Sequence, residues 1–368
     1  MEKKIKVAHV IRVFSYGGAE VLLRECFAHP YFKEKLTSDL YILDHKKLGL
    51  VDEVKPNLNT IHHYKISSIE FVSNYIKFLR QIIKGRYDVV HAHLPAAGWM
   101  TIPAKLFIRK TKFVYSEHNL VTFYAKRNYY LIGLVYSFFD SVICVSHEVR
   151  EVVKKSQKGR FFEPRKIITI LNGIDTNKFS NRHRFDKNAN KKFTVGLVAR
   201  FRPQKRIDRW VEVAAATYKL NPAINFLMVG DGPDDEMLRK KIKASDMQGK
   251  IELPGMLSNT VDVFKLIDIF LLTSDFEGLP LALLEAMSSG CIPVVSNVGG
   301  IKQLSFDGFG HKFGKFDAVA IAKVIVAYVA DPMKLKTESL NAKRFAEENF
   351  PLTKQVHEIA ALYKGLTI

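Results

Sequence analysis

The chain has 368 residues, 47% of them hydrophobic, so it can form two packed domains and is unlike a disordered chain. Its 56 Lys and Arg against 37 Asp and Glu give a formal net charge of +19, with 29 of the basic and 16 of the acidic side chains in residues 1–180. This charge favours anionic partners such as nucleic acid, acidic lipid or phosphorylated small molecules, although a solvated lysine-rich surface has the same composition. No stretch approaches about 18 consecutive apolar residues, and the N-terminus is unlike a signal peptide, so we expect a cytoplasmic protein without a membrane span.

The three cysteines are odd in number and far apart, which excludes a disulfide framework. Cys26, Cys144 and Cys291 stand in apolar surroundings and are expected to be buried thiols in a reducing compartment. Neither a CxxC pair nor a Cys/His cluster stands out, so no metal site is expected.

The first half of the chain alternates strand and helix patterns. Its apolar runs lack inside/outside alternation, which predicts a parallel sheet covered by helices on both faces. The expected strands are Ile5–Arg12, Asp39–Leu43, Tyr87–Leu94, Lys112–Ser116, Ser141–Val145 and Lys166–Leu171, and the expected helices include Ala19–Ala28, Ser68–Lys84 and Tyr124–Phe139.

A polar stretch at 175–192 interrupts this rhythm, which then restarts. We therefore expect two doubly wound α/β domains, 1–178 and 193–350, joined by a linker at 179–192, with a C-terminal helix at 351–368 packing back on the first domain. Since ligands of such sheets bind outside the carboxyl ends of the strands, two facing sheets should leave a binding cleft. The expected strands are Phe193–Val198, Asn225–Val229, Lys250–Leu253, Asp268–Leu272 and Cys291–Ser296, and the last helices are Ala318–Ala330, Met333–Glu348 and Leu352–Lys364.

Residues 274–290 (SDFEGLPLALLEAMSSG) begin at the carboxyl end of a strand. Pro280 suits the first turn of a helix that Gly290 stops. A helix N-terminus reached through glycine offers amides near Gly278 and Leu279 to phosphate or sugar oxygens, whereas Pro280 has no N–H.

Two glutamates mark this helix start. Glu277 stands just before the helix and Glu285 about one turn inside it. Beside an anion site, a carboxylate is a poor phosphate ligand but a good acceptor for sugar or ribose hydroxyls. An acidic residue that only offsets the helix dipole would explain Glu277 but not both.

The spacing of these glutamates within EGLPLALLEAMSSGCIPVVSNVGG resembles the paired-glutamate signature of retaining GT-B glycosyltransferases of glycosyltransferase family four. The resemblance covers nearly the whole chain and implies two Rossmann-like domains facing across a cleft, with no cofactor and no metal. The other matching segments are FSYGGAE near the start, SEHN (116–119), NGID (172–175), ARFRPQK (199–205), VGDGP (229–233) and LPG (253–255).

By this resemblance, Glu277 would hydrogen-bond the transferred hexose, Glu285 would bind the ribose hydroxyls, and Arg200 and Lys205 would clasp the diphosphate. These cations and the helix amides would stabilise charge on the leaving diphosphate without a metal ion. No protein nucleophile is expected, because the family's front-face mechanism lets the leaving phosphate oxygen help deprotonate the acceptor. A solvated basic loop is the alternative reading of the two cations.

The first domain has two matching features. Gly17 and Gly18 follow the first strand, and in the family this loop faces the donor phosphates and the acceptor; a tight turn without ligand is the alternative. Glu20 is expected in the first helical turn. His118 ends a strand and matches a histidine that contacts the donor sugar or the reacting centre, unless it is a capping or core histidine.

His91 and His93 occupy alternate positions of one strand and are interpreted as structural. The chain also departs from the family in two places. Arg206 stands where a glycine usually follows the loop lysine, and Lys302 and Gln303 replace a proline and a glutamate. These changes bear on loop conformation and donor-sugar preference.

The expected activity is transfer of a hexose or N-acetylhexosamine from a nucleotide-diphosphate sugar, with UDP-sugars favoured and GDP-mannose next. The acceptor would be a glycan or lipid-linked hydroxyl in bacterial surface polysaccharide synthesis. The alternatives are an epimerase or phosphorylase of the same architecture, or a non-catalytic basic module that binds membranes. A NAD-dependent dehydrogenase lacks support because GxGxxG does not follow the first strand, and no motif supports nucleic acid.

Basic side chains of the first domain suit peripheral contact with an anionic membrane on the inner face of the plasma membrane. An ordinary helix with solvated lysines is the alternative. The side chains concerned are Lys77, Arg80, Lys84, Arg86, Lys105, Arg109, Lys110 and Lys112, together with Lys126 and Arg127 in an aromatic-rich stretch.

Overall fold

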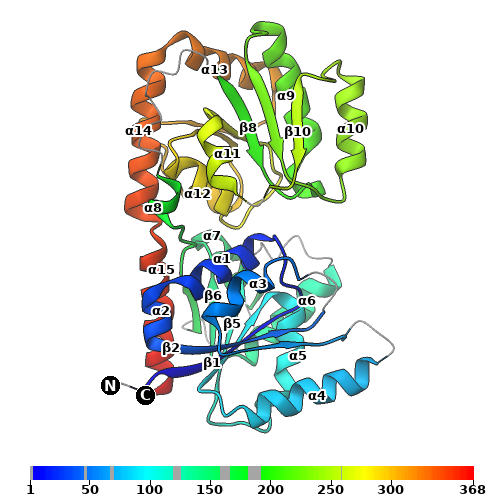
Figure 1. Ribbon diagram of the computed structural model, residues 1–368, viewed down its shortest axis with the longest axis vertical. Coiled ribbons are helices and arrows are strands. Elements are labelled where there is room, and N and C mark those ends of the chain that lie inside the picture. Colours follow the sequence, from blue (N-terminus) through cyan, green and yellow to red (C-terminus); the bar gives the residue numbers. More distant parts are fainter. Residues whose placement is uncertain are drawn as a thin grey trace. The chain divides into compact units, whose positions relative to one another are not determined.

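The computed structural model describes residues 3–44, 48–66, 70–118, 126–157, 166–180, 192–257 and 259–368, without the side chains of residues 126–131. The chain forms two compact units, coloured from blue to red along the sequence in Figure 1. Unit 1 comprises Met1–Gly173 and Leu352–Ile368, and unit 2 comprises Ile174–Pro351.

Unit 1 is built on a seven-stranded sheet in the order β3-β2-β1-β4-β5-β6-β7, and all neighbouring strands are parallel. The central strands β1 and β4 are mostly buried, as their apolar runs without alternation predict. The strands are β1 (Ile5–Ile11), β2 (Leu36–Ile42), β3 (Thr60–His63), β4 (Val89–His93), β5 (Lys112–Glu117), β6 (Ser141–Cys144) and β7 (Ile167–Thr169).

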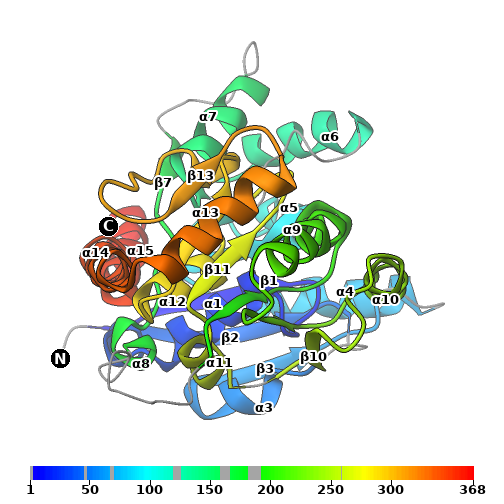
Figure 2. The same ribbon diagram turned by 90° about the horizontal axis from the view of Figure 1, so that it is seen from above.

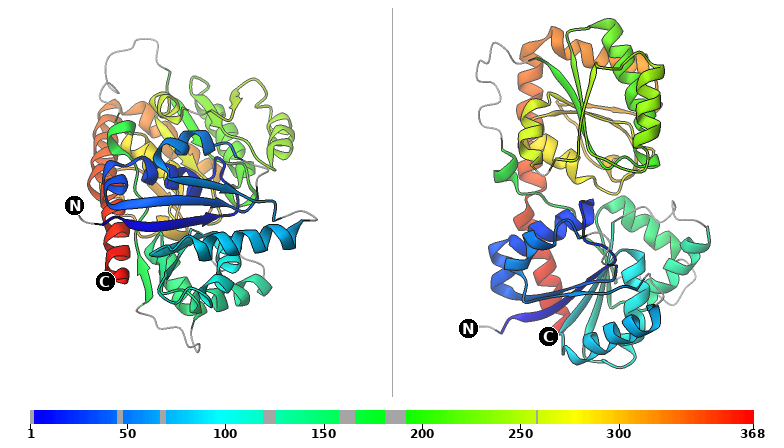
Figure 3. Two further views of the ribbon diagram at one scale, coloured as in Figure 1. Left: turned by 60° about the horizontal axis from the view of Figure 1, so that its bottom comes forward. Right: turned by 45° about the vertical axis from the view of Figure 1, so that its right-hand side comes forward.

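Helices cover both faces of this sheet (Figure 3). From the central strand β1 the chain adds β2 and β3 towards one edge of the sheet. It then crosses back to β4, on the other side of β1, and adds β5, β6 and β7 towards the opposite edge. Because crossovers between parallel strands are right-handed, helices α1–α3 lie on one face of the sheet and α4–α7 on the other. In agreement, α4 packs on α5 and α5 on α6, whereas α15 packs on α1 and α2. The helices are α1 (Gly18–Ala28), α2 (Pro30–Lys35), α3 (Val51–Val54), α4 (Phe71–Lys84), α5 (Leu94–Lys105), α6 (Lys126–Ser137), α7 (His147–Ser156) and α15 (Leu352–Thr367), with the 3₁₀ turn η1 (Lys55–Asn57).

Unit 2 has a six-stranded parallel sheet in the order β10-β9-β8-β11-β12-β13. Helices α9 and α13 pack side by side over it (Figure 2). The strands are β8 (Thr194–Val198), β9 (Asn225–Val229), β10 (Ile251–Gly255), β11 (Ile269–Leu272), β12 (Ile292–Ser296) and β13 (His311–Phe313). The helices are α8 (Thr176–Phe179), α9 (Ile207–Leu220), α10 (Asp235–Ala244), α11 (Thr260–Leu266), α12 (Leu281–Ser288), α13 (Ala318–Ala330) and α14 (Pro332–Asn349), with the 3₁₀ turns η4 (Pro203–Lys205) and η5 (Gly299–Ile301).

The predicted α/β class with two parallel, helix-covered sheets is confirmed, but the sequence analysis missed two edge strands. These are β3 and β13, which are short and carry polar side chains (TIHH and HKF). A strand at the edge of a sheet is less enclosed than a central one, so it need not be an apolar run. Apolar patterning therefore marks the central strands and not these.

The boundary between the units lies five residues before the predicted end of the first domain. The reason is local, since Ile174 N donates to the Phe350 carbonyl at 2.9 Å and so ties this segment to unit 2. Residues 181–191 of the predicted linker lie outside the described residues. Helix α15 belongs to unit 1, where Gln355 Oε1 accepts a hydrogen bond from Gly173 N at 2.8 Å.

Two expectations from composition can be compared with the structure. The three cysteines are buried thiols, as predicted, and burial raises the pKa of the Cys26 thiol to about 12. Among the described helices, none is both long and apolar enough to cross a membrane.

Candidate functional site

The most informative side chains of unit 2 lie just beyond the carboxyl end of β11. The Glu277 side chain is 6% exposed, and its Oε1 accepts hydrogen bonds from Lys205 Nζ at 2.6 Å and from Ser274 Oγ at 2.6 Å. Lys205 is itself only 15% exposed. Two donors to one oxygen fix the orientation of the carboxylate, and the lysine supplies the compensating charge.

A glycine-rich turn supports the backbone of Glu277. Gly300 N donates to the Glu277 carbonyl at 3.1 Å, and Gly299 has a φ of +52°. A Cβ at Gly299 would overlap the Glu277 carbonyl oxygen, so the close approach of the two loops requires glycine there. Lys302 and Gln303, where the chain departs from the family, come directly after this turn and leave the contact in place.

Helix α12 begins after Pro280, which occupies its N-cap position, and Gly290 beyond its end has a φ of +78°. Gly278 and Leu279 therefore lie in the loop before the helix, with the Leu279 side chain buried. Glu285 is buried in the helix, slightly more than one turn from its start. The start and stop residues predicted from sequence are thus confirmed to within one residue, with Pro280 preceding the first turn.

Arg200 follows β8 by two residues, and its Nη1 lies 3.4 Å from Asp231 Oδ1. Asp231 is a partner that sequence reasoning missed. It lies between Gly230 and Gly232, where a Cβ would overlap the backbone of the Arg200 loop. The GDG spacing after β9 was visible in the sequence, and its physical role here is to let the two loops pack closely.

Arg206 occupies the position where the family has glycine, and the structure explains how it is accommodated. Its φ of +46° and ψ of +52° lie in the left-handed region that favours glycine. Its guanidinium binds Asp208 at 2.8 and 3.0 Å and reaches Asp275 at 3.3 Å, and Arg209 binds Asp275 at 2.7 Å. The loop therefore keeps the glycine conformation, and ion pairs hold the arginine in it.

We expect Arg206→Ala to lower the free energy of unfolding by about 1 kcal/mol more than Arg206→Gly. Both variants lose the same ion pairs, but only alanine keeps the strain of a left-handed residue. Urea denaturation followed by tryptophan fluorescence measures the difference. Equal stability of the two variants would show that the backbone at this position is not left-handed in solution.

In unit 1, the two glycines after β1 have different roles. Gly17 is the N-cap of α1, and a Cβ there would overlap the Glu20 carboxylate, which lies in the first helical turn as predicted. A Cβ at Gly18 meets no described atom within 4 Å. Glycine at position 17 therefore leaves room for the Glu20 carboxylate, and the ligand-approach role of the two glycines stays a prediction.

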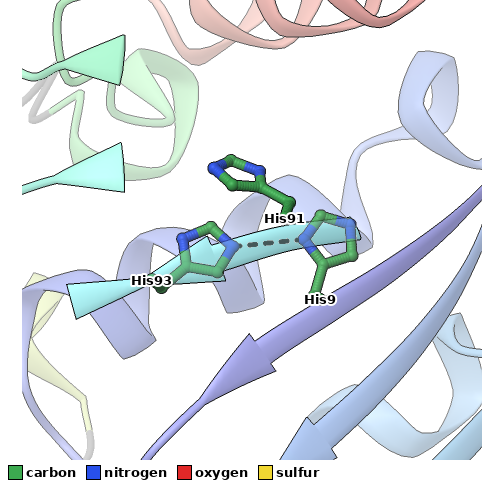
Figure 4. A group of neighbouring side chains, drawn as sticks. All are labelled: His9, His91 and His93. Carbon is green, nitrogen blue, oxygen red and sulfur yellow. Dashed lines mark hydrogen bonds between the residues drawn. The ribbon is translucent and has the colours of Figure 1, made fainter. Parts of the chain in front are cut away.

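A cluster of buried histidines lies on one face of the unit 1 sheet (Figure 4). β1 pairs His9 with His91 of β4, and His9 Nδ1 lies 3.3 Å from His93 Nε2. His91 is hydrogen-bonded at both ring nitrogens, to Tyr363 Oη of α15 at 2.5 Å and to Ser116 Oγ at 2.8 Å. These bonds agree with the structural interpretation of His91.

His118 follows β5 and adjoins this cluster, with its ring centroid 6.1 Å from that of His93. Burial lowers the pKa of His118 to about 4, so the ring is neutral at physiological pH. Its Nε2 is buried without a hydrogen-bond partner among the described residues, as are His9 Nε2 and His93 Nδ1. The four histidines line a cavity of about 30 Å³, which has room for a water molecule.

The described residues include one group with the spacing of metal ligands, namely His9, His91 and His93, in which one nitrogen of each ring lies within 4.8 Å of the others. His91 would have to release Tyr363 or Ser116 to bind an ion. No metal site is expected from the sequence, in which these residues are not recognisable as a group. His9 is 84 residues from His93, and only the pairing of β1 with β4 brings them together.

This cluster predicts acid sensitivity of unit 1. Burial lowers the pKa of His9 to about 3 and lowers those of His91 and His93 well below 6.5. The unfolded chain therefore binds more protons, and stability that is present above pH 6.5 is lost as the pH falls towards 3. At pH 5 the lowered pKa of His9 alone costs about 2 kcal/mol, and His91 and His93 shift the stability in the same direction.

Thermal unfolding between pH 7.5 and pH 5 checks this expectation. His9→Gln should reduce the pH dependence, whereas His357→Gln, a change at an exposed histidine, should leave it unaltered. A melting temperature that does not change over this range would contradict the buried neutral state.

Comparisons with known proteins agree with this architecture. The family profile described as glycosyl transferases group 1 matches residues 179–348, and the profile described as glycosyltransferase family 4 matches residues 42–178. The chain is 28% identical to the Escherichia coli UDP-Gal:alpha-D-GlcNAc-diphosphoundecaprenol alpha-1,3-galactosyltransferase, over 99% of this chain and 98% of the relative. It is 26% identical to the capsular polysaccharide biosynthesis glycosyltransferase CapH of Staphylococcus aureus, over 80% and 82% of the two chains.

Solved structures show the same fold. Anabaena Alr3699/HepE in complex with UDP and glucose superposes with a TM-score of 0.84 at 19% identity, covering 98% of this chain and 99% of that one. The apo form of the lipopolysaccharide outer core galactosyltransferase WaaB gives 0.72 at 17% identity, covering 98% and 100%. The fold is therefore GT-B, as predicted. The chain belongs to the group 1, family four type of glycosyltransferases, and the predicted family is confirmed.

Proposed function

We propose that this protein is a retaining glycosyltransferase that moves a hexose or N-acetylhexosamine from a UDP-sugar to a hydroxyl of a lipid-linked glycan. The observation that carries the proposal is the contact of 2.6 Å between Lys205 Nζ and Glu277 Oε1. The bond that breaks joins the hexose to the diphosphate. A group that binds the hexose and a group that binds the diphosphate must therefore be neighbours, and these two are.

In the proposed mechanism, Glu277 accepts a hydrogen bond from a hydroxyl of the transferred hexose. Lys205 and Arg200 bind the diphosphate and stabilise the negative charge that gathers on it as the bond to the sugar breaks. The acceptor proton passes to the leaving phosphate oxygen on the same face, so no protein nucleophile is used. Glu285 binds the ribose hydroxyls equally before and during reaction and so contributes to affinity.

For the site residues of unit 1 we propose roles near the donor and acceptor. Gly18 allows the backbone to approach the ligand, with Gly17 supporting the turn. His118 contacts the donor sugar or the reacting centre through its neutral ring. Its buried Nε2, without a partner among the described residues, supports this assignment over a capping role.

The donor and acceptor classes follow the relatives. The name of the E. coli relative specifies a UDP-Gal donor and a GlcNAc acceptor on diphosphoundecaprenol, and this chain aligns with 98% of its length. We therefore propose a UDP-hexose donor, with GDP-mannose next, and a polyprenyl-diphosphate sugar as acceptor. The capsular relative supports a place in bacterial surface polysaccharide synthesis. Such an acceptor places the enzyme at the inner face of the plasma membrane.

A thermal-shift screen with UDP, GDP, ADP and their sugars tests the donor. A ligand at 100 times its dissociation constant should add about 2.7 kcal/mol of stability. The preferred donor is then incubated with a polyprenyl-diphosphate GlcNAc, and NMR of the product reports the anomer. An α-linked product from a UDP-hexose means retention. A β-linked product, an epimerised nucleotide sugar or a sugar phosphate would overturn the proposal in favour of inversion, an epimerase or a phosphorylase.

We further expect transfer to survive EDTA. In the proposed site the diphosphate charge is met by Arg200 and Lys205, so a divalent cation has no required role there. Initial rates with and without an excess of EDTA measure this, and circular dichroism checks that the protein stays folded. Complete loss of activity that manganese restores would contradict the proposed electrostatics.

A further inference from the structure

Exposed large apolar side chains of unit 1 gather on one group of helices. Apart from Ile368 at the C-terminus, all those described lie on α4, α5 or α6 or directly after α5 and α6. Isolated exposed apolar residues are normal, whereas exposed apolar residues that adjoin one another are candidates for an interaction surface. The residues are Phe71, Val72 and Ile76 of α4, Trp99 of α5, Leu106 and Phe107 after α5, Leu134 of α6 and Phe138 after α6.

These residues belong to one side of the unit. Helices α4, α5 and α6 cover the same face of the sheet, and α4 is tied to α5 by a hydrogen bond from Tyr75 Oη to the Met100 carbonyl at 3.2 Å. The ends of α5 and α6 are tied together, because Lys105 Nζ donates to the Phe138 carbonyl at 2.7 Å. Figure 1 shows α4 and α5 side by side on this face.

The most exposed point of this face is the turn after α5. Leu106 and Phe107 are adjacent in sequence and each is 71% exposed, while Arg109 and Lys110 in the same turn are also exposed. Apolar side chains next to basic ones are the combination that binds anionic lipid, since the apolar groups enter the interface and the cations meet the headgroups.

Lys105 is not one of these cations, although the sequence places it among the basic side chains expected to face a membrane. Its Nζ forms an ion pair with Asp140 at 3.0 Å and lies over the ring of Phe113. Lys105 therefore joins α5 to the end of α6 instead of facing a partner.

We propose that this face docks on an anionic lipid bilayer, with Leu106 and Phe107 inserted into the interface and Arg109 and Lys110 bound to lipid phosphates. The occupant is a membrane because the exposed groups are both apolar and positively charged. The relevance of the surface to catalysis rests on the proposed lipid-linked acceptor, but the binding itself does not require activity.

Sedimentation of the full chain with vesicles of phosphatidylcholine and phosphatidylglycerol, against pure phosphatidylcholine, tests the proposal. Each basic side chain near such a surface contributes about fivefold in affinity, so Arg109→Gln/Lys110→Gln should weaken binding to anionic vesicles by roughly 25-fold. Leu106→Ser/Phe107→Ser should weaken binding by at least about tenfold and abolish protection of residues 106–110 by vesicles in hydrogen exchange. The matched controls in unit 2 are Arg239→Gln/Lys240→Gln, an exposed basic pair, and Met333→Ser at an exposed apolar residue.

Equal recovery with both lipids, or equal effects of the control changes, would overturn the proposal. So would a result in which Leu106→Ser/Phe107→Ser converts a dimer to a monomer without changing vesicle binding, because the face would then bind a second copy of the chain. Sugar transfer is also measured with a water-soluble, short-chain acceptor, which does not require the enzyme to bind a membrane. This assay tests the proposed function separately from the docking surface. If the protein binds vesicles but shows no transfer to either acceptor, the proposed function fails and the docking surface stands.

Discussion

Replacing Glu277 by glutamine should reduce turnover by a factor on the order of 10²–10³ while leaving the fold intact. Glutamine has the same shape, so it fills the same buried space, but it removes the charge that pairs with Lys205 and weakens the bond proposed for the hexose hydroxyl. Turnover with saturating UDP-sugar measures the effect. The melting temperature checks that the loss is chemical and not structural.

Glu285→Gln is the matched control, because it is the other buried carboxylate of the motif. Its proposed ribose contacts are similar in the ground and transition states, so it should raise the Michaelis constant for the donor more than it lowers turnover. Near-normal turnover of Glu277→Gln would remove Glu277 from the reacting centre and with it the proposed donor site.

Arg200→Ala should also reduce transfer by a factor on the order of 10²–10³, because a cation that meets developing charge on the diphosphate stabilises the transition state more than the ground state. The fold should tolerate this change. The pair with Asp231 spans 3.4 Å between side chains that are 26% and 48% exposed, and such surface pairs contribute about 1 kcal/mol or less. Steady-state kinetics give the loss directly.

Arg202 provides a control from the same loop. It is exposed, two residues from Arg200, and would share the effect if the loop were only a general basic surface. We expect Arg202→Ala to change the rate by no more than about twofold, since substitutions at exposed positions are usually nearly neutral. Equal losses in the two variants would favour the solvated-loop interpretation over a specific diphosphate contact.

The candidate residues of unit 2 could be predicted from sequence because their signals are short and local. Glu277 and Glu285 lie on one loop and one helix turn, and Lys205 follows a strand in the same sheet. Parallel strands end at one edge of a sheet, so residues beyond β8 and β11 meet although 72 residues separate Lys205 from Glu277. A pattern of strands and motifs is sufficient for this inference.

Other features depend on contacts that no local pattern encodes. The histidine cluster can be predicted only if β1 is known to lie next to β4. The role of Lys105 likewise depends on its ion pair with Asp140, which is 35 residues away in the sequence. The conformation of Arg206 is similar. The sequence shows an arginine in place of glycine, but not whether the loop keeps its conformation. That depends on Asp208 and Asp275, which the fold brings to the Arg206 guanidinium. Tertiary side-chain partners therefore set the limit of sequence reasoning here.

The return of α15 to unit 1 has a consequence for the order in which the chain can fold during synthesis. Unit 2 is continuous in sequence and can be completed as soon as residue 351 has left the ribosome. Unit 1 begins before unit 2 in the sequence, yet Tyr363, which is fully buried and hydrogen-bonded to His91, is synthesised after the whole of unit 2. The seven strands of unit 1 are made early, but its sheet must wait for α15 before the face that carries His91 is covered. A product that stops after residue 351 would therefore have a complete unit 2 and an incompletely covered unit 1.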